Sequence, residues 1–397
     1  MRIAGALALA ALAAAPAHAD ELPPITDRDW ALDLYDGAAI GTVRIVGMGG
    51  AALATAEGSA GTLVNPAAVA VRPATSRGWW DWDFHVDTLR AVYTSDFDNN
   101  GLLAGDDTGV STTTAGISGV FGKLGIALVA TTQSTRLAPD VAQTNLGGLR
   151  ADADRGKVAI ARAFAGDAIT VGLAARIGEL TLYDVADDED GVPLFQITGT
   201  GFEAGALWRP PLDDFRLGAA VSLPVTGRQV SVADCDPMNC RGYILPDRVE
   251  VPWQVSVGGA WRRAPTRWNQ RVRGWFRDER SLLVAVDLVV TGAVPDGYGL
   301  EAFGRQELQP SGRHAVFSGR AGVEWERTPG HVRLRGGTYW EPGRFEGVGG
   351  RPHITAGIEW GFFNFCFFWS RYRLRVSLTA DVAPRYGNAG VSFGFWH

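Results

Sequence analysis

Charged residues alternate with apolar ones in several segments near the carboxyl end, most clearly in RYRLRVSLTADV, from Arg371 to Val382. The predicted charge cluster comprises Glu324, Arg333, Arg335, Glu359, Arg371, Arg373 and Arg375. Charges of both signs at this density predict an ion-pair network that fills an interior space or holds a plug, because pairing offsets the desolvation of confined charges. The alternative is a carboxylate-binding arginine site, since a guanidinium can bind a carboxylate through two parallel hydrogen bonds.

A second group with potential chemistry lies in the acidic stretch DFDNNGLLAGDD. Asp96, Asp98, Asn100 and Asp107 fall at positions 1, 3, 5 and 12 of a calcium-loop pattern, and Leu102 offers its backbone carbonyl at position 7. Clustered hard oxygens suit Ca²⁺. However, position 12 is Asp rather than Glu. A weak structural calcium site and an acidic loop without metal therefore both remain open.

The cysteines and the missing signatures narrow the chemistry further. Cys235 and Cys240 lie five residues apart in CDPMNC and predict a local disulfide in an oxidising compartment, and Cys366 is left unpaired. The sequence lacks H-E-x-x-H and P-loop patterns. We therefore expect no enzyme and no cofactor beyond the calcium already considered. The net charge of -6 gives no indication of nucleic-acid binding.

The elements that must position these residues are strands. In RYRLRVSLTADV one face is apolar and the other carries the three arginines, a period of two that excludes a helix. The same alternation predicts about fourteen strands, near residues 78–90, 109–121, 123–135, 155–165, 168–181, 198–208, 214–230, 250–263, 280–292, 312–326, 331–341, 351–362, 370–382 and 387–396. Short turns alternate with long polar loops, and Trp often stands at a strand end. These features predict a transmembrane antiparallel β-barrel, with the short turns on the periplasmic side; an exported soluble β-sandwich or propeller is the alternative.

The amino terminus indicates export. MRIAGALALAALAAAPAHA has a basic start, an apolar run and an A-x-A site, which predicts cleavage before Asp20. We therefore divide the chain into a signal peptide (1–19), a segment before the first strand (20–77) and a barrel (78–397). The middle segment is rich in Gly and Ala and contains an Asn65-Pro66 turn signal. It predicts a compact plug folded into the lumen, or else a periplasmic tail.

Residues 41–70, GTVRIVGMGGAALATAEGSAGTLVNPAAVA, resemble the amino-terminal hatch of FadL-like outer-membrane transport proteins, in which G-x-x-R-x-x-G-M-G-G-A leads to N-P-A. The matching positions are Gly41, Arg44, Gly47, Met48, Gly49, Gly50, Ala51, Asn65, Pro66 and Ala67. The resemblance implies a plugged barrel in the outer membrane that carries hydrophobic small molecules such as long-chain fatty acids. It also implies that a movement of the hatch releases the ligand sideways through the wall.

The sequence departs from this family at its mature start, DELPPITDRDWALDLYDG, which is acidic where the transporters tend to be apolar. The hatch motif also occurs in relatives that resemble components of assembly or secretion machinery. Two functions therefore remain: a passive transporter whose partners are a hydrophobic ligand and membrane lipid, and a barrel that serves as an assembly, secretion or surface-scaffold partner. The sequence is compatible with a monomer and with an oligomer.

Overall fold

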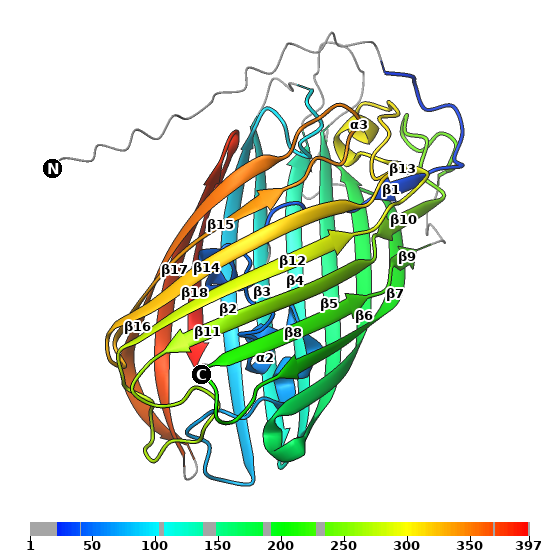
Figure 1. Cartoon of the computed structure of the whole chain (residues 1–397). Coiled ribbons are helices and arrows are strands. Elements are labelled where there is room, and N and C mark those ends of the chain that lie inside the picture. Colours follow the sequence, from blue (N-terminus) through cyan, green and yellow to red (C-terminus); the bar gives the residue numbers. More distant parts are fainter. Residues whose placement is uncertain are drawn as a thin grey trace, which may run out of the picture.

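The protein is a closed antiparallel β-barrel of fourteen strands (Figure 1). The structure, a computed structural model, describes residues 22–39, 41–102, 107–137, 148–185, 192–227, 235–367 and 370–395, so the expected signal peptide lies outside them. The wall strands are β2 (Trp80–Thr94), β3 (Asp107–Phe121), β4 (Leu124–Leu137), β5 (Leu149–Phe164), β6 (Ile169–Asp184), β7 (Val192–Trp208), β8 (Phe215–Ser222), β11 (Gln254–Arg263), β12 (Ser281–Thr291), β14 (Val316–Thr328), β15 (Val332–Glu341), β16 (Arg351–Phe367), β17 (Ser370–Ala383) and β18 (Tyr386–Phe395). β18 pairs with β2 and closes the ring. The predicted fold class is confirmed, and each expected strand has a counterpart.

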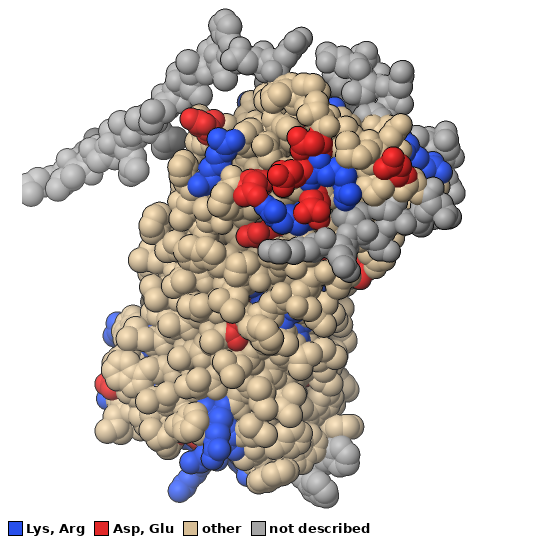
Figure 2. Space-filling model, turned by 90° about the vertical axis from the view of Figure 1, so that its right-hand side faces the viewer, with Lys and Arg blue, Asp and Glu red and all other residues tan. Residues whose placement is uncertain are grey.

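The period-two alternation becomes an inside and an outside of the barrel. On β6, Val171 and Leu173 are 44% and 60% exposed on the outer face, whereas Thr170 and Ala174 are buried on the inner face. Figure 2 shows that Lys, Arg, Asp and Glu gather toward the two ends of the molecule and leave a largely uncharged band between them. Trp208, Trp261 and Trp325 stand exposed near the ends of their strands, as an interfacial girdle requires. This exterior is that of a membrane-spanning barrel.

The two ends of the barrel differ in their connections. Short turns such as 122–123 and 329–331 lie at the periplasmic end, and most connections at the opposite, extracellular end are longer. The loop of residues 264–280, between β11 and β12, breaks this pattern, because it is long and lies at the short-turn end. Its Trp268 is buried against Met48 and Ala260. We call residues 264–280 the periplasmic loop; the alternation of short and long connections did not predict it.

The segment before the first wall strand lies inside the barrel, where it forms α1 (Val43–Gly47), α2 (Gly58–Thr62) and the 3₁₀ turn η1 (Pro66–Ala70). We call residues 41–71 the hatch. They are largely buried, with Val46, Ala51 and Ala67 at 0–1% exposure. The expectation of a plug in the lumen, rather than a periplasmic tail, agrees with this placement.

A short strand that the sequence did not predict begins the described chain at the extracellular end (Figure 1). β1 (Ala31–Asp33) runs parallel between β10 (Arg248–Val251) and β13 (Gly297–Tyr298), and β10 also pairs with β9 (Val225–Gly227). Trp30 and Leu32 pack there in an apolar cluster with Phe303 of α3 (Leu300–Gly304). From β1 at the extracellular end, the described chain therefore descends through the lumen before it enters the wall.

Candidate functional site

The residues of the hatch motif hold the hatch in its fold and against the wall. Gly49 and Gly50 adopt the left-handed region, with φ of 61° and 73°, which favours glycine. Arg44 forms an ion pair with Glu324 of β14, 3.2 Å between Nε and Oε2. Asn65 caps η1: its Oδ1 accepts from the backbone N–H of Ala67, at 3.0 Å. The motif is thus accounted for by close packing and capping.

The remaining motif residues make backbone or packing contacts. Thr355 of β16 donates its hydroxyl to the carbonyl of Gly47, at 3.2 Å. Met48 and Ala67 are buried, and Pro66 is the first residue of η1. Gly41 lines a cavity above the hatch.

Three inward-facing carboxylates of the wall bind backbone N–H groups of the hatch. Asp287 of β12 accepts from Ala52 and Leu53, both at 2.8 Å. On β2, Asp87 accepts from the first residue of α1, at 2.8 Å, and Asp83 accepts from α2 at 3.0 Å. Orphan N–H groups at turns and helix starts need such acceptors. Sequence analysis missed these residues. The available signal for Asp287 was a lone Asp on the otherwise uncharged inner face of β12, and for Asp83 and Asp87 it was the alternation of acidic residues along β2.

Glycines of the wall allow the hatch backbone to lie directly on the strands. A methyl group at each would come within 3 Å of a hatch backbone atom, so only glycine fits; the positions are Gly125, Gly172, Gly218, Gly322 and Gly337. They lie on five different strands around the ring. The wall is therefore shaped around the hatch on most of its circumference.

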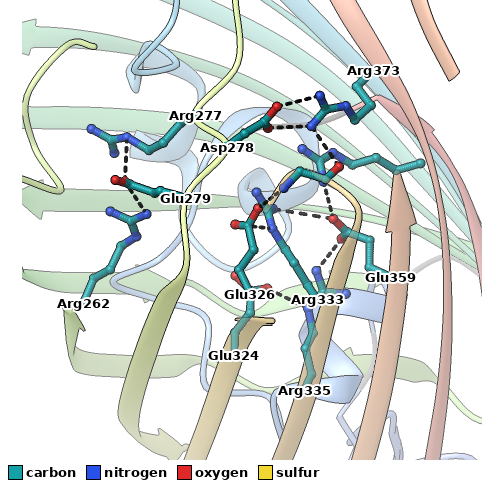
Figure 3. A network of polar contacts seen from close by, with 12 residues as sticks. Arg262, Arg277, Asp278, Glu279, Glu324, Glu326, Arg333, Arg335, Glu359 and Arg373 are labelled. Carbon is teal, nitrogen blue, oxygen red and sulfur yellow. Dashed lines mark hydrogen bonds and ion pairs between the residues drawn. The ribbon is translucent and has the colours of Figure 1, made fainter. Parts of the chain in front are cut away.

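Five of the seven residues in the predicted charge cluster meet in one buried network (Figure 3). Glu359 pairs with Arg335, with Arg375 at 2.6 Å and with Arg333 at 3.5 Å. Glu324 pairs with Arg335 at 2.6 Å as well as with the hatch. The network links β14, β15, β16 and β17, and Glu326 joins it through Arg333, at 3.1 Å.

The other two predicted members contact the periplasmic loop. Arg373 makes two hydrogen bonds to Asp278, at 2.6 and 2.8 Å. Arg371 lies 5.5 Å from the ring of Trp275. Asp278 lies outside the wall strands, and although burial alone would raise its pKa, the hydrogen bonds and charge of Arg373 lower the pKa below its ordinary value. The loop is thus tied to the barrel by charged contacts that the sequence pattern did not reveal.

The hatch separates two cavities in the lumen. The upper cavity, of about 230 Å³, is lined by apolar side chains such as Leu53, Val129 and Val289, together with charged residues. Its charged residues include the pair Lys157–Glu203, at 2.7 Å. An extracellular cavity of about 90 Å³ shares Leu34, Tyr35, Asp36 and Arg155 with it. The lower cavity, of about 170 Å³, lies between the hatch and the periplasmic loop.

The structure places the predicted calcium residues only partly together. Carboxylate oxygens of Asp96, Asp98 and Glu301 lie within 4.8 Å of one another, and Glu301 comes from α3. Asn100 donates its side-chain amide to Glu301, at 3.4 Å, and its Oδ1 accepts from the backbone N–H of Leu102, at 2.7 Å. Asp107 begins β3 and is not part of this trio. The group therefore differs from the loop pattern in its last ligand.

Proximity of the acidic groups alters their protonation. Burial and then the neighbouring Glu301 carboxylate raise the pKa of Asp98 well above its ordinary value. Burial also raises the pKa of Glu301. In the extracellular loops, Cys235 and Cys240 form the predicted disulfide. Cys366, near the end of β16, is free and exposed.

Within the described residues, no helix has the length and apolar character needed to cross a membrane.

No protein-family model matches the chain, and no curated protein matches it. Solved structures do. A Pseudomonas aeruginosa FadL homologue is 12% identical with a TM-score of 0.55, covering 92% of this chain and 98% of its own. The P. putida toluene transporter TodX is 13% identical with a TM-score of 0.55, covering 91% and 99%, and the CymD monoaromatic hydrocarbon channel is 11% identical with a TM-score of 0.56, covering 91% and 97%. The chain has the fold of the FadL-like channels. At these identities the likeness is one of fold, and it confirms the fold expected from the hatch motif.

Proposed function

We propose that the protein is an outer-membrane channel through which hydrophobic small molecules enter passively, without a catalytic step. The observation that carries this proposal is the upper cavity, which lies inside a membrane-spanning wall and adjoins a second cavity toward the extracellular loops. Ligand sites are concave and combine apolar surface with polar groups that orient the ligand, and the upper cavity has both kinds of lining. The fold shared with a toluene transporter and a monoaromatic hydrocarbon channel supports the same class of cargo.

The size of the upper cavity favours a compact cargo over a long chain. Its volume of about 230 Å³ exceeds the roughly 150 Å³ that accommodates a benzene molecule in an engineered protein cavity. It is smaller than the roughly 300–1,000 Å³ typical of sites for drug-sized ligands. We therefore place monoaromatic compounds before long-chain fatty acids as the cargo.

A second candidate is a barrel that stays closed and serves as an assembly, secretion or surface-scaffold partner. The packing of the hatch favours it, because wall glycines and buried carboxylates hold the hatch on most sides. A channel must release some of these contacts for a molecule to pass. A channel therefore requires that some contacts between the hatch and the wall break, whereas a closed barrel requires that they persist.

Filling the upper cavity tests the channel. Gly178 of β6 lines it, and an added Cβ would meet only a methyl group of Val225, at 3.4 Å. Gly178→Leu should therefore fold and reduce uptake of radiolabelled toluene severalfold in Gram-negative cells that lack their own channel for it. Gly319→Leu, on the exposed outer face of β14 with open space around it, is the matched control. If cells that produce the parent protein take up no more toluene than cells without it, the transport proposal is overturned and the scaffold is favoured.

A further inference from the structure

We propose that the lower cavity, on the periplasmic side of the hatch, binds an oxyanion carried on a compact apolar body, such as an aromatic carboxylate. The inference deepens the proposed function by naming a chemical class of cargo, and it rests on that function for its physiological direction. The binding itself is argued from the lower cavity alone.

The lining of the lower cavity is strongly cationic. Eleven arginines but only four acidic residues line it. Three more carboxylates, on Asp278, Glu279 and Glu359, pair with lining arginines from just outside. The eleven lining arginines outnumber these seven carboxylates. The resulting positive field favours an anion that enters the cavity.

Several of these arginines hold donors that the protein does not use. Arg209, Arg262 and Arg375 are each more than nine-tenths buried and line the cavity. Each arginine donates a hydrogen bond from one terminal nitrogen to an oxygen of the protein. A second nitrogen of each side chain finds no acceptor among the described residues: Nε of Arg209, Nη1 of Arg262 and Nε of Arg375. Buried donors are ordinarily satisfied, because an unmade hydrogen bond costs desolvation free energy. A carboxylate or phosphate offers the acceptors they lack.

Aromatic rings supply the apolar part of the same cavity. The lining includes Trp268, Trp275 and Phe276 of the periplasmic loop, with Tyr372 and Phe395 from the wall. Arginines stack on these rings: the guanidinium of Arg216 lies 3.9 Å from the Trp268 ring and that of Arg373 lies 4.2 Å from Phe276. Rings and donors thus lie side by side, as an amphiphilic ligand needs. The volume of about 170 Å³ suits a single substituted ring.

The test compares a charged probe with a neutral one of the same shape on the full mature protein in detergent. Benzoate and benzyl alcohol are titrated by calorimetry and by tryptophan fluorescence, with inorganic phosphate as competitor. We expect saturable binding of benzoate at least about tenfold tighter than that of benzyl alcohol, and its displacement by phosphate at millimolar concentration. Equal affinity for the two ring compounds would overturn the proposal. So would saturation by phosphate without binding of benzoate, which would indicate an adventitious ion only.

Variants localise the binding to the lower cavity. Arg262→Gln should weaken benzoate binding at least tenfold, whereas Arg263→Gln, the exposed neighbour on the opposite face of β11, should leave it unchanged. Arg271→Gln provides a second variant that should fold, because Arg271 lines the cavity but is largely exposed. Its benzoate affinity should fall severalfold. Unchanged affinity in both Arg262→Gln and Arg271→Gln would overturn the assignment.

The outcome is separable from that of the transport test. Toluene is neutral and its uptake depends on the upper cavity, whereas benzoate binding in detergent requires no passage through the hatch. If benzoate does not bind but toluene enters, the lower site fails alone. If benzoate binds and toluene does not enter, the proposed channel fails while the oxyanion site stands.

Discussion

Three buried carboxylates of the wall bind the backbone of the hatch. Asp83, Asp87 and Asp287 are each at most 4% exposed, and each accepts from hatch backbone N–H groups. Glu324 and Glu359, by comparison, pair with arginine side chains. The wall thus uses two kinds of acid: one that pairs with arginine and one that binds the backbone of the plug.

Removal of one such acid should loosen the hatch locally. Asp287→Ala leaves the N–H groups of Ala52 and Leu53 without their acceptor, at a cost of about 1–3 kcal/mol for each buried group. Hydrogen exchange followed by mass spectrometry should then show at least roughly tenfold faster exchange in the peptide around these residues. Asp213→Ala, in an exposed periplasmic turn, should leave the exchange unchanged. Equal protection in Asp287→Ala and the parent protein would contradict the role.

The acidic trio of the extracellular loops predicts a dependence on pH and calcium. The pKa of Asp98 is raised above its ordinary value of 3.8, so the folded loop binds protons more tightly than the unfolded loop. Its stability should be greatest below that value and should fall as the pH rises from there through the raised pKa. Calcium would replace the proton and offset this loss, so we expect weak binding at millimolar Ca²⁺.

Limited proteolysis of the loops between pH 4 and pH 8, with and without Ca²⁺, measures both effects. Cleavage should become faster toward pH 8 and slower again with Ca²⁺. Asp98→Asn should abolish both responses, because it removes the carboxyl group whose pKa is raised. If that variant keeps the full pH response, another group is responsible, and calorimetry without calcium heat would end the metal prediction.

At the scale of elements, the wall and the hatch form one packed unit. The strands place glycine where the hatch backbone touches them, and the periplasmic loop covers the hatch from below through Trp268. The β11–β12 connection is therefore a second closing element. A cargo leaving toward the periplasm must pass this loop as well as the hatch.

A side chain at a contact glycine should push the hatch away from the wall. Gly322→Val would place atoms within 3 Å of the Met48 backbone, so the hatch must shift or the barrel must distort. We expect higher single-channel conductance in planar bilayers together with a lower unfolding temperature. Gly319→Val, three residues earlier on the outer face of β14, meets open space and should change neither. Parent-like conductance in Gly322→Val would indicate that the hatch tolerates displacement without opening.

The sequence predicted the strands of the wall well, but it did not predict the contacts that the hatch, β1 and the periplasmic loop make with the wall. The difference has a physical reason. Alternation is local, so RYRLRVSLTADV reveals its inner face without knowledge of its neighbours. The pairing of Arg373 with Asp278 depends on a loop 95 residues away in the chain, and β1 depends on two strands more than 200 residues distant. Asp287 is the single charged residue of β12, and its partners in the hatch are more than 200 residues away in the chain. Contacts between residues far apart in the chain leave no periodic pattern in the sequence, so they could not be predicted from it.

At the scale of the whole molecule, the uncharged belt commits the barrel to a membrane. Val286, midway along β12, is 52% exposed on the outer face, and Leu282 is 38% exposed near the periplasmic end of the same strand. Both would face lipid, at different depths. The energetic cost of a charge on this surface should therefore depend on depth.

Arginine scanning along β12 checks that orientation. Val286→Arg should lower the free energy of unfolding in lipid vesicles by about 2–4 kcal/mol, and Leu282→Arg by roughly 0–1 kcal/mol, because the latter lies near the interface. Denaturant titration followed by tryptophan fluorescence gives both values. Equal costs at the two positions would argue that β12 is not embedded as proposed.

The path of the chain through its own barrel has a consequence for assembly. β1 is anchored at one end, the hatch fills the lumen, and the chain leaves at the other end to begin β2, which must then pair with β18. A ring sealed before this segment was inside would require the segment to be threaded through it. The β2–β18 seam is therefore expected to form last, around a segment already in place. Once this seam has formed, the amino-terminal segment is topologically trapped inside a closed ring. It can leave only if β1 detaches or the β2–β18 seam opens.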